Sequence, residues 1–184
     1  TAVNQNLVLN LMAYIDYEGE QPQFKIPEDA NIQWHNATDY ISNEPIYKSP
    51  QYNLVYDGWK RNEMRTSQSL SGFVLGKGFG KNKGDKVSYE INILPEKEKG
   101  MIGFRYNTPK GKTSTFQVKG ITESRLELQG TGEYSIVSIP YSCKEPGKYT
   151  LELTSEGTYS TDLDGFFIGS EEDIKQIKIL PRKL

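Results

Sequence analysis

Apolar and polar residues alternate along much of the second half of the chain, as they do in a strand with one buried side and one side facing water. The clearest run is 87–93, where Val87, Tyr89, Ile91 and Ile93 alternate with polar residues without interruption. Similar runs cover 7–15, 101–106, 115–118, 124–128, 133–139, 148–153 and 163–168. The alternation therefore predicts about eight strands.

Short segments rich in glycine and proline separate these runs. They include Lys99-Gly100, Pro109-Lys110-Gly111, Gly130-Thr131-Gly132, Glu145-Pro146-Gly147 and Glu156-Gly157. Glycine and proline supply the backbone angles that tight turns require. Many short strands joined by such turns are typical of an all-β fold, and we expect an antiparallel β-sandwich of the jelly-roll type.

Helical periodicity is nearly absent. The one helix start is Ser170 followed by the acidic residues 171–173, which predicts one short helical turn near the C-terminus. A strand-like tail at 177–180 follows, as an edge strand or as the exit toward a further domain. We expect a single β-sandwich domain over 1–184, with a loop-rich segment at about 22–70 and a C-terminal tail at 170–184, as part of a larger multidomain protein.

Composition narrows the function classes. Among 184 residues, 22 Lys and Arg nearly balance 24 Asp and Glu, so no positive field draws the protein to nucleic acid. The apolar runs are too short or too interrupted to span a membrane. Cys143 is the only cysteine, which excludes an intrachain disulfide. The start at Thr1 fits a processed or excised chain.

Several segments occur in an order that resembles a known family. Gly84 and Asp85 open a strand of the form Val-x-Tyr, Gly103 to Tyr106 ends in Arg-Tyr, 146–151 is a Gly-Lys turn and strand, and 162–168 is a closing Leu-Asp strand. This pattern is similar to that of family 6 and family 35 carbohydrate-binding modules, which are galactose-binding-like jelly rolls. The resemblance covers about 85 residues, from 84 to 168, and implies a secreted, periplasmic or cell-surface protein.

The resemblance also implies a structural Ca²⁺. In those modules, acidic residues of the opening strand and the aspartate of the closing strand hold the ion together. The corresponding residues here are Glu18, Glu20 and Asp164. Glu18 and Glu20 share one face of a strand, and Ca²⁺ prefers several hard oxygen ligands, so the chemistry is consistent. Two acids at this spacing are also what the solvated face of a strand carries.

The loop-rich segment holds the best candidates for sugar recognition. A sugar ring has an apolar face bordered by hydroxyls, so a site needs exposed aromatic rings and a few hydrogen-bonding groups. Trp59 follows the turn signal Asp57-Gly58 and is our first choice for a stacking platform. The resemblance adds Asp162, which stands where the modules have Asn and cannot donate as an amide does. The full candidate set is Trp34, Tyr56, Trp59, Arg61, Asn62, Tyr159 and Asp162.

Two other interpretations remain open. Trp34 and Trp59 also fit core aromatics that pack long loops onto the sandwich. Arg61, Glu63 and Arg65 match the Arg-x-Glu-x-Arg strand of a β-jelly-roll alginate lyase family, but the rest of that motif is missing and the only histidine, His35, lies upstream.

The function that we expect is a non-catalytic carbohydrate-binding module. It would hold a polysaccharide or oligosaccharide by ring stacking and hydrogen bonds, beside a catalytic domain in the same polypeptide. The first alternative is a structural sandwich that packs on a catalytic domain without a ligand of its own. The second is a small jelly-roll polysaccharide lyase or hydrolase.

Overall fold

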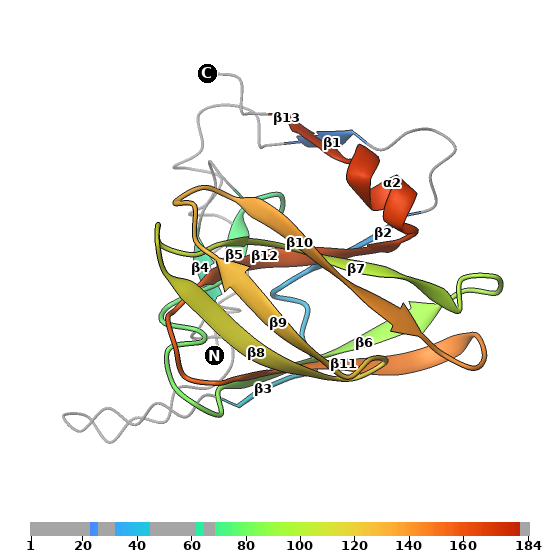
Figure 1. The fold of residues 1–184 in the computed structure, drawn as a ribbon, viewed down its shortest axis with the longest axis horizontal. Coiled ribbons are helices and arrows are strands. Elements are labelled where there is room, and N and C mark those ends of the chain that lie inside the picture. The colour runs from blue at the N-terminus through green and yellow to red at the C-terminus, as the bar shows by residue number, and fades with distance from the viewer. Residues whose placement is uncertain (1–22, 26–31, 45–61, 65–68, 181–184) are drawn as a thin grey trace, which may run out of the picture.

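The computed structural model describes residues 23–25, 32–44, 62–64 and 69–180, and in this part of the chain two antiparallel sheets lie face to face (Figure 1). The six-stranded sheet has the order β10 (Ser135–Ser142), β7 (Lys99–Asn107), β12 (Asp162–Gly169), β5 (Phe73–Leu75) and β4 (Asn62–Met64), and β2 (Gln33–Asn36) also pairs with β12. The five-stranded sheet has the order β3 (Ser42–Glu44), β6 (Lys86–Ile93), β11 (Gly147–Ser155), β8 (Thr113–Gly120) and β9 (Ser124–Gln129).

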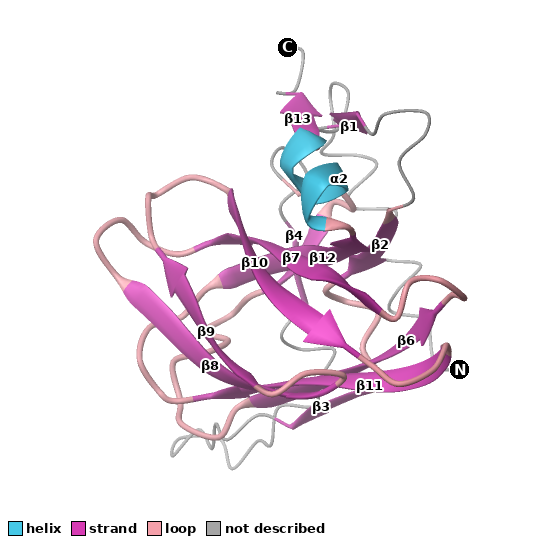
Figure 2. Cartoon of the chain, turned by 45° about the vertical axis from the view of Figure 1, so that its right-hand side comes forward, coloured by secondary structure: helices cyan, strands magenta, loops and turns pink. Residues whose placement is uncertain are grey.

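A short helix, α2 (Glu171–Gln176), follows β12 and lies beside the six-stranded sheet (Figure 2). The Ser170 hydroxyl accepts a hydrogen bond of 3.0 Å from the Asp173 amide, so the predicted helix start is confirmed. Ile174 is buried, and its side chain lies against Gly103 of β7. The chain then forms β13 (Lys178–Leu180), which pairs with β1 (Gln23–Lys25). None of the described helices has the length and apolar character that a membrane span requires.

The core lies between the two sheets. In β6 the predicted alternation is confirmed over its second half, where Tyr89, Ile91 and Ile93 are buried while Glu90 and Asn92 are exposed. The five-stranded sheet therefore has one packed face and one face toward water. The largest fully buried side chains are Phe79, Tyr89, Phe104, Phe116, Phe166 and Phe167.

Unlike the second half of β6, β7 and β12 have buried residues on both of their faces. Helix α2 contributes to the cover on the outer side, and Trp34 of the neighbouring strand β2 packs on Phe167 with ring centroids 4.5 Å apart. Strand β12 also contains a β-bulge. Leu163 pairs with Tyr106 and Gly165 with Arg105, so Asp164 is the extra residue between them.

The predicted fold class is confirmed: the structure is an all-β sandwich of antiparallel sheets with one short helix near the C-terminus. Each predicted strand from 87 onward is present as β6 to β12. The predicted strand at 7–15 lies outside the described residues. In the segment at about 22–70, for which we expected loops, the described parts contain the short strands β1 to β4.

Candidate functional site

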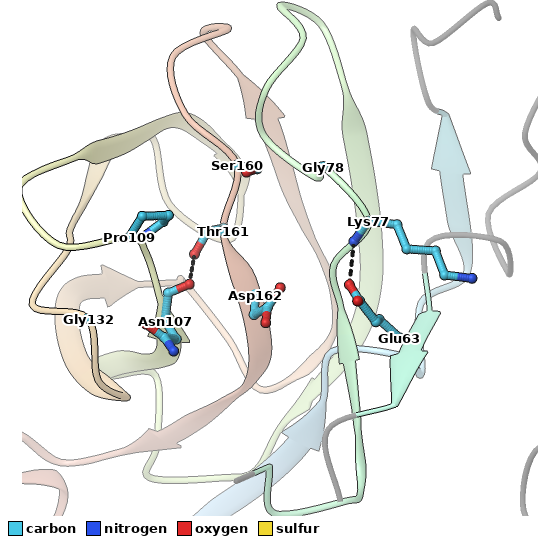
Figure 3. Close-up of a pocket in the computed structure, with 9 residues that line it drawn as sticks. All are labelled: Glu63, Lys77, Gly78, Asn107, Pro109, Gly132, Ser160, Thr161 and Asp162. Carbon is cyan, nitrogen blue, oxygen red and sulfur yellow. Dashed lines mark hydrogen bonds between the residues drawn. The ribbon is translucent and has the colours of Figure 1, made fainter. Parts of the chain in front are cut away.

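At one end of the strands of the six-stranded sheet, polar groups from segments that are far apart in the sequence lie close together. Asn107 ends β7 and pairs in register with Asp162, which begins β12. Gly76 follows β5, and Glu63 lies on β4, the next strand across. A cavity of about 420 Å³ opens here (Figure 3), lined by Glu63, Lys77, Gly78, Asn107, Pro109, Gly132, Ser160, Thr161 and Asp162.

Buried hydroxyls fix one side of this cavity. The Thr161 hydroxyl donates to the Asn107 carbonyl at 3.2 Å and accepts from the Thr108 hydroxyl at 2.9 Å. Thr108 and Thr161 are both buried, and these bonds join the end of β7 to the start of β12. The Asn107 side chain is partly exposed, and its amide both donates and accepts hydrogen bonds.

Carboxylates form the other side. The Oε2 atom of Glu63 accepts a hydrogen bond of 2.9 Å from the backbone amide of Lys77. A Cβ atom placed on Gly76 would lie 2.6 Å from Glu63 Oε2 and 2.9 Å from Asp162 Oδ1, so both carboxylates converge on this glycine. Figure 3 shows the Lys77 ammonium directed away from Asp162. Carboxylate oxygens only accept hydrogen bonds, which suits partners that present hydroxyl or amine protons.

Among the described residues, Tyr159 is an exposed aromatic residue that directly precedes Ser160, which lines the cavity. The Tyr159 side chain is 47% exposed. Lys112 lies over the ring, with Nζ 4.7 Å from the centroid, and also donates to the Tyr159 hydroxyl at 3.3 Å. The ammonium therefore fixes the orientation of a ring that remains accessible to a ligand.

The other candidates from the sequence lie elsewhere. Asn62 accepts a hydrogen bond from the Tyr40 hydroxyl at 3.2 Å. Trp34 lies opposite Phe167, five positions along β12 from Asp162, or about 17 Å at the usual strand rise. The structure therefore does not bring Trp34 into the cavity with Asp162 and Tyr159. Its role in sugar binding stays a prediction, as does that of Tyr56, Trp59 and Arg61, which lie outside the described residues.

Asp164, a predicted calcium ligand, occupies a different environment. It is completely buried, forms an ion pair with Arg105, and accepts the Leu70 amide at 3.1 Å to each carboxylate oxygen. Burial raises the pKa of Asp164 to about 6, although Arg105 and the Leu70 amide act in the opposite direction.

These donors bear on the predicted calcium site. A guanidinium and an amide already satisfy the Asp164 carboxylate, so this residue does not fit a Ca²⁺ ligand well. Glu18 and Glu20 lie outside the described residues, and among the described residues no three His, Cys, Asp or Glu form a metal-binding group. The calcium ion stays a prediction from the resemblance alone.

The sequence pattern did not indicate Asn107, Ser160 or Thr161 as site residues, and Glu63 stood out only as part of a lyase motif. Asn107 directly follows the Arg105-Tyr106 pair, which was a signal that a strand ends at this position. Glu63 carries no comparable signal, because only the pairing of β4 with β5 places it beside Gly76.

No protein-family model matches the sequence. No curated protein matches it either. Solved structures do share its fold. The C-terminal family 6 carbohydrate-binding module of a marine laminarinase from Zobellia galactanivorans has a TM-score of 0.53 at 17% identity, over 76% of this chain and 100% of that chain. A family 35 carbohydrate-binding module from Clostridium thermocellum has a TM-score of 0.52 at 13% identity, over 82% of this chain and 99% of that chain.

A larger enzyme contains a similar unit. A cycloisomaltooligosaccharide glucanotransferase from Paenibacillus sp. matches with a TM-score of 0.55 at 16% identity, over 77% of this chain. The chain spans only 19% of that enzyme. At these identities the likeness concerns the fold, which the two isolated modules match over nearly their whole length. The chain therefore has the β-sandwich fold of carbohydrate-binding modules.

Proposed function

We propose that this chain binds carbohydrate without catalysing a reaction, and that the cavity between Asn107, Asp162 and Glu63 is its binding site. The observation that carries the proposal is this polar cavity at the edge of a carbohydrate-binding-module fold. Its volume of about 420 Å³ lies within the range of small-molecule pockets, which is enough for a sugar unit. The likeness to modules that are solved as separate units supports a binding role.

The groups around the cavity suit sugar hydroxyls. Each hydroxyl donates one hydrogen bond, and the carboxylate oxygens of Asp162 are acceptors. The amide of Asn107 complements them, because it also donates. Tyr159 precedes Ser160 of the cavity in the chain, and its exposed ring would supply an apolar surface on which the C–H face of a sugar stacks. We expect a binding mode in which hydrogen bonds select the sugar and the ring adds affinity.

We further propose that the chain is an accessory domain of a secreted, glycoside-active protein. The fold is present as part of a much longer glucanotransferase, of which this chain would span 19%. An accessory module that holds a glycan raises the local concentration of substrate for a linked catalytic domain, without contributing to the chemistry.

Isothermal titration against a panel of neutral and acidic polysaccharides and their oligosaccharides tests the binding role. We expect saturable binding to at least one glycan, and we expect Tyr159→Ala to weaken it by about threefold to tenfold, the contribution of a stacked aromatic ring. Leu94→Ala is the matched control, since Leu94 is also an exposed apolar side chain and lies at the opposite end of the sandwich, where β6 turns toward β7. An absence of binding across the whole panel would support the structural accessory role instead.

A further inference from the structure

The turn that follows β5 has an unfavourable backbone conformation. Lys77 has φ of 48° and Gly78 has φ of 84°, so both central residues are left-handed, and the Phe79 amide closes the turn on the Gly76 carbonyl at 3.0 Å. Glycine adopts this conformation freely, but in lysine the Cβ atom crowds the following carbonyl. A lysine in this position therefore depends on an external contact to stay there.

Glu63 provides that contact. Its Oε2 atom accepts the Lys77 amide at 2.9 Å, across a separation of 14 residues. The bond is charge-assisted, and it joins β4 to the loop between β5 and β6 rather than to another strand. The hydrogen bond comes from the amide of Lys77, the residue with the unfavourable φ angle, so the carboxylate stabilises the turn at its strained position.

Gly76 fixes the position of the carboxylate. Because this glycine has no Cβ, Glu63 Oε2 reaches within 2.6 Å of the place where one would lie, and Asp162 Oδ1 reaches within 2.9 Å from the other side. Contacts below about 3.0 Å do not occur for a real Cβ atom. A larger residue at position 76 would therefore displace both carboxylate oxygens. Gly76, Glu63 and the Lys77 turn are consequently interdependent parts of one wall of the cavity.

We propose that Glu63 is a positioning residue, whose carboxylate holds the Gly76–Gly78 turn through the Lys77 amide and so sets the shape of the cavity beside Asp162. The effect on a ligand rests on the function proposed above. The hydrogen bond by which Glu63 stabilises the turn is independent of that function, because it concerns only contacts within the chain. The two parts are therefore tested by different measurements.

Amide hydrogen exchange, followed by NMR on the full chain, tests the hold on the turn. In Glu63→Ala we expect the Lys77 amide to exchange about tenfold faster, since it loses a charge-assisted acceptor. In Glu63→Gln, whose side-chain carbonyl still accepts, we expect exchange close to that of the wild type. Unchanged exchange at Lys77 in Glu63→Ala would overturn the proposal. Equal acceleration in both variants would also overturn it, because the conservative variant would then have failed to rescue the turn.

A second variant keeps the test decisive if Glu63→Ala does not fold. Gly76→Ala leaves the carboxylate in place chemically but displaces it sterically, so we expect the same acceleration at Lys77. The amides of β6 and β11 serve as the control for the fold, because those strands pair at the centre of the other sheet. Normal protection at Lys77 in Gly76→Ala would contradict the interdependence.

Glycan titration of the same variants tests the effect on the cavity. If the wild type binds a glycan, we expect Glu63→Ala to weaken binding by about tenfold and Glu63→Gln to retain most of it. An unchanged affinity in Glu63→Ala, together with a loosened Lys77 amide, would overturn the role in shaping the cavity. If the wild type binds no glycan, the proposed function fails, while the exchange experiment still decides whether Glu63 holds the turn.

Discussion

Asp162 and Asp164 lie two residues apart on β12, yet their surroundings are opposite. Asp162 is partly exposed and lines the cavity, where its carboxylate faces Gly76. Asp164 is completely buried and is held by Arg105 and the Leu70 amide. The same residue type thus lines a cavity at the start of the strand and is buried within the fold two residues later.

The β-bulge explains the difference. Strict alternation would place residues two apart on the same face, but the pairing of β12 with β7 shifts between Leu163 and Gly165. Leu163 and Phe166 both belong to the core, although residues three positions apart lie on opposite faces of a regular strand. Asp164 therefore has no partner in the register with β7, and its carboxylate turns toward Arg105 and Leu70 instead. A bulge next to a site redirects side chains in this manner.

Breaking the buried pair is the strongest test of this comparison. We expect Asp164→Ala and Arg105→Ala each to lower the free energy of unfolding by about 3–5 kcal/mol, since each leaves an uncompensated buried charge or donor. Urea denaturation at neutral pH measures the loss. The double variant should lose less than the sum of the single variants, because both remove one interaction. Additive losses would show that Asp164 and Arg105 are stabilised by separate contacts.

An exposed ion pair serves as the control. The Nζ atom of Lys148 lies 2.8 Å from Oε1 of Glu90 on neighbouring strands of the five-stranded sheet, and both side chains are exposed to water. Since surface pairs contribute little, Lys148→Ala should leave the stability nearly unchanged.

Asp162 should show the reverse behaviour. We expect Asp162→Ala to weaken glycan binding by about tenfold, the effect of losing a charged hydrogen-bond acceptor, and to leave unfolding within about 0.5 kcal/mol of the wild type. Parallel titration and urea denaturation measure the two effects. Glu123→Ala is a matched control, because this exposed carboxylate lies in the turn between β8 and β9, at the far end of β8 from the cavity. A variant of Asp162 that unfolds would show that both aspartates are structural.

The sequence predicted the fold well where one face of a strand meets water. In β6, β8, β9 and β11 the alternation is visible because exposed polar residues separate the buried ones. In β12 the bulge changes the phase of the alternation, which no local pattern reveals. Helix α2 was predictable because Ser170 and the acids after it act locally.

The cavity was predictable only in part. Asp162 came from the resemblance, because it stands just before the closing Leu-Asp strand, and Tyr159 was a candidate because it lies near that place in the chain. Asn107 and Glu63 meet Asp162 only because the sheet order sets β7 and β5 on either side of β12, with β4 next to β5. That order depends on pairings between distant segments, and a pattern read within one strand does not contain it.

The second half of β12 offers a smaller and pH-dependent test. His35 on β2 stacks on Phe166, with ring centroids 4.9 Å apart and planes at 8°, and its Nε2 atom is buried without a hydrogen-bond partner. Burial lowers the pKa of His35 below 6.5, while the Asp39 carboxylate acts in the opposite direction. The unfolded chain therefore takes up a proton first as the pH falls, and stability that is complete above 6.5 is lost below it.

His35→Phe removes this titration and keeps a ring against Phe166. We expect the wild type to lose stability relative to His35→Phe as the pH falls from 7.5 to 5.5. This loss should be smaller than the loss of unfolding free energy in Asp164→Ala or Arg105→Ala. Thermal unfolding of both proteins across this range measures the difference, in which other titrating groups cancel. A constant difference would show that the imidazole is protonated equally in the folded and unfolded states. The packed half of β12 would then tolerate a charge, and the contrast with its open end at Asp162 would be one of exposure alone.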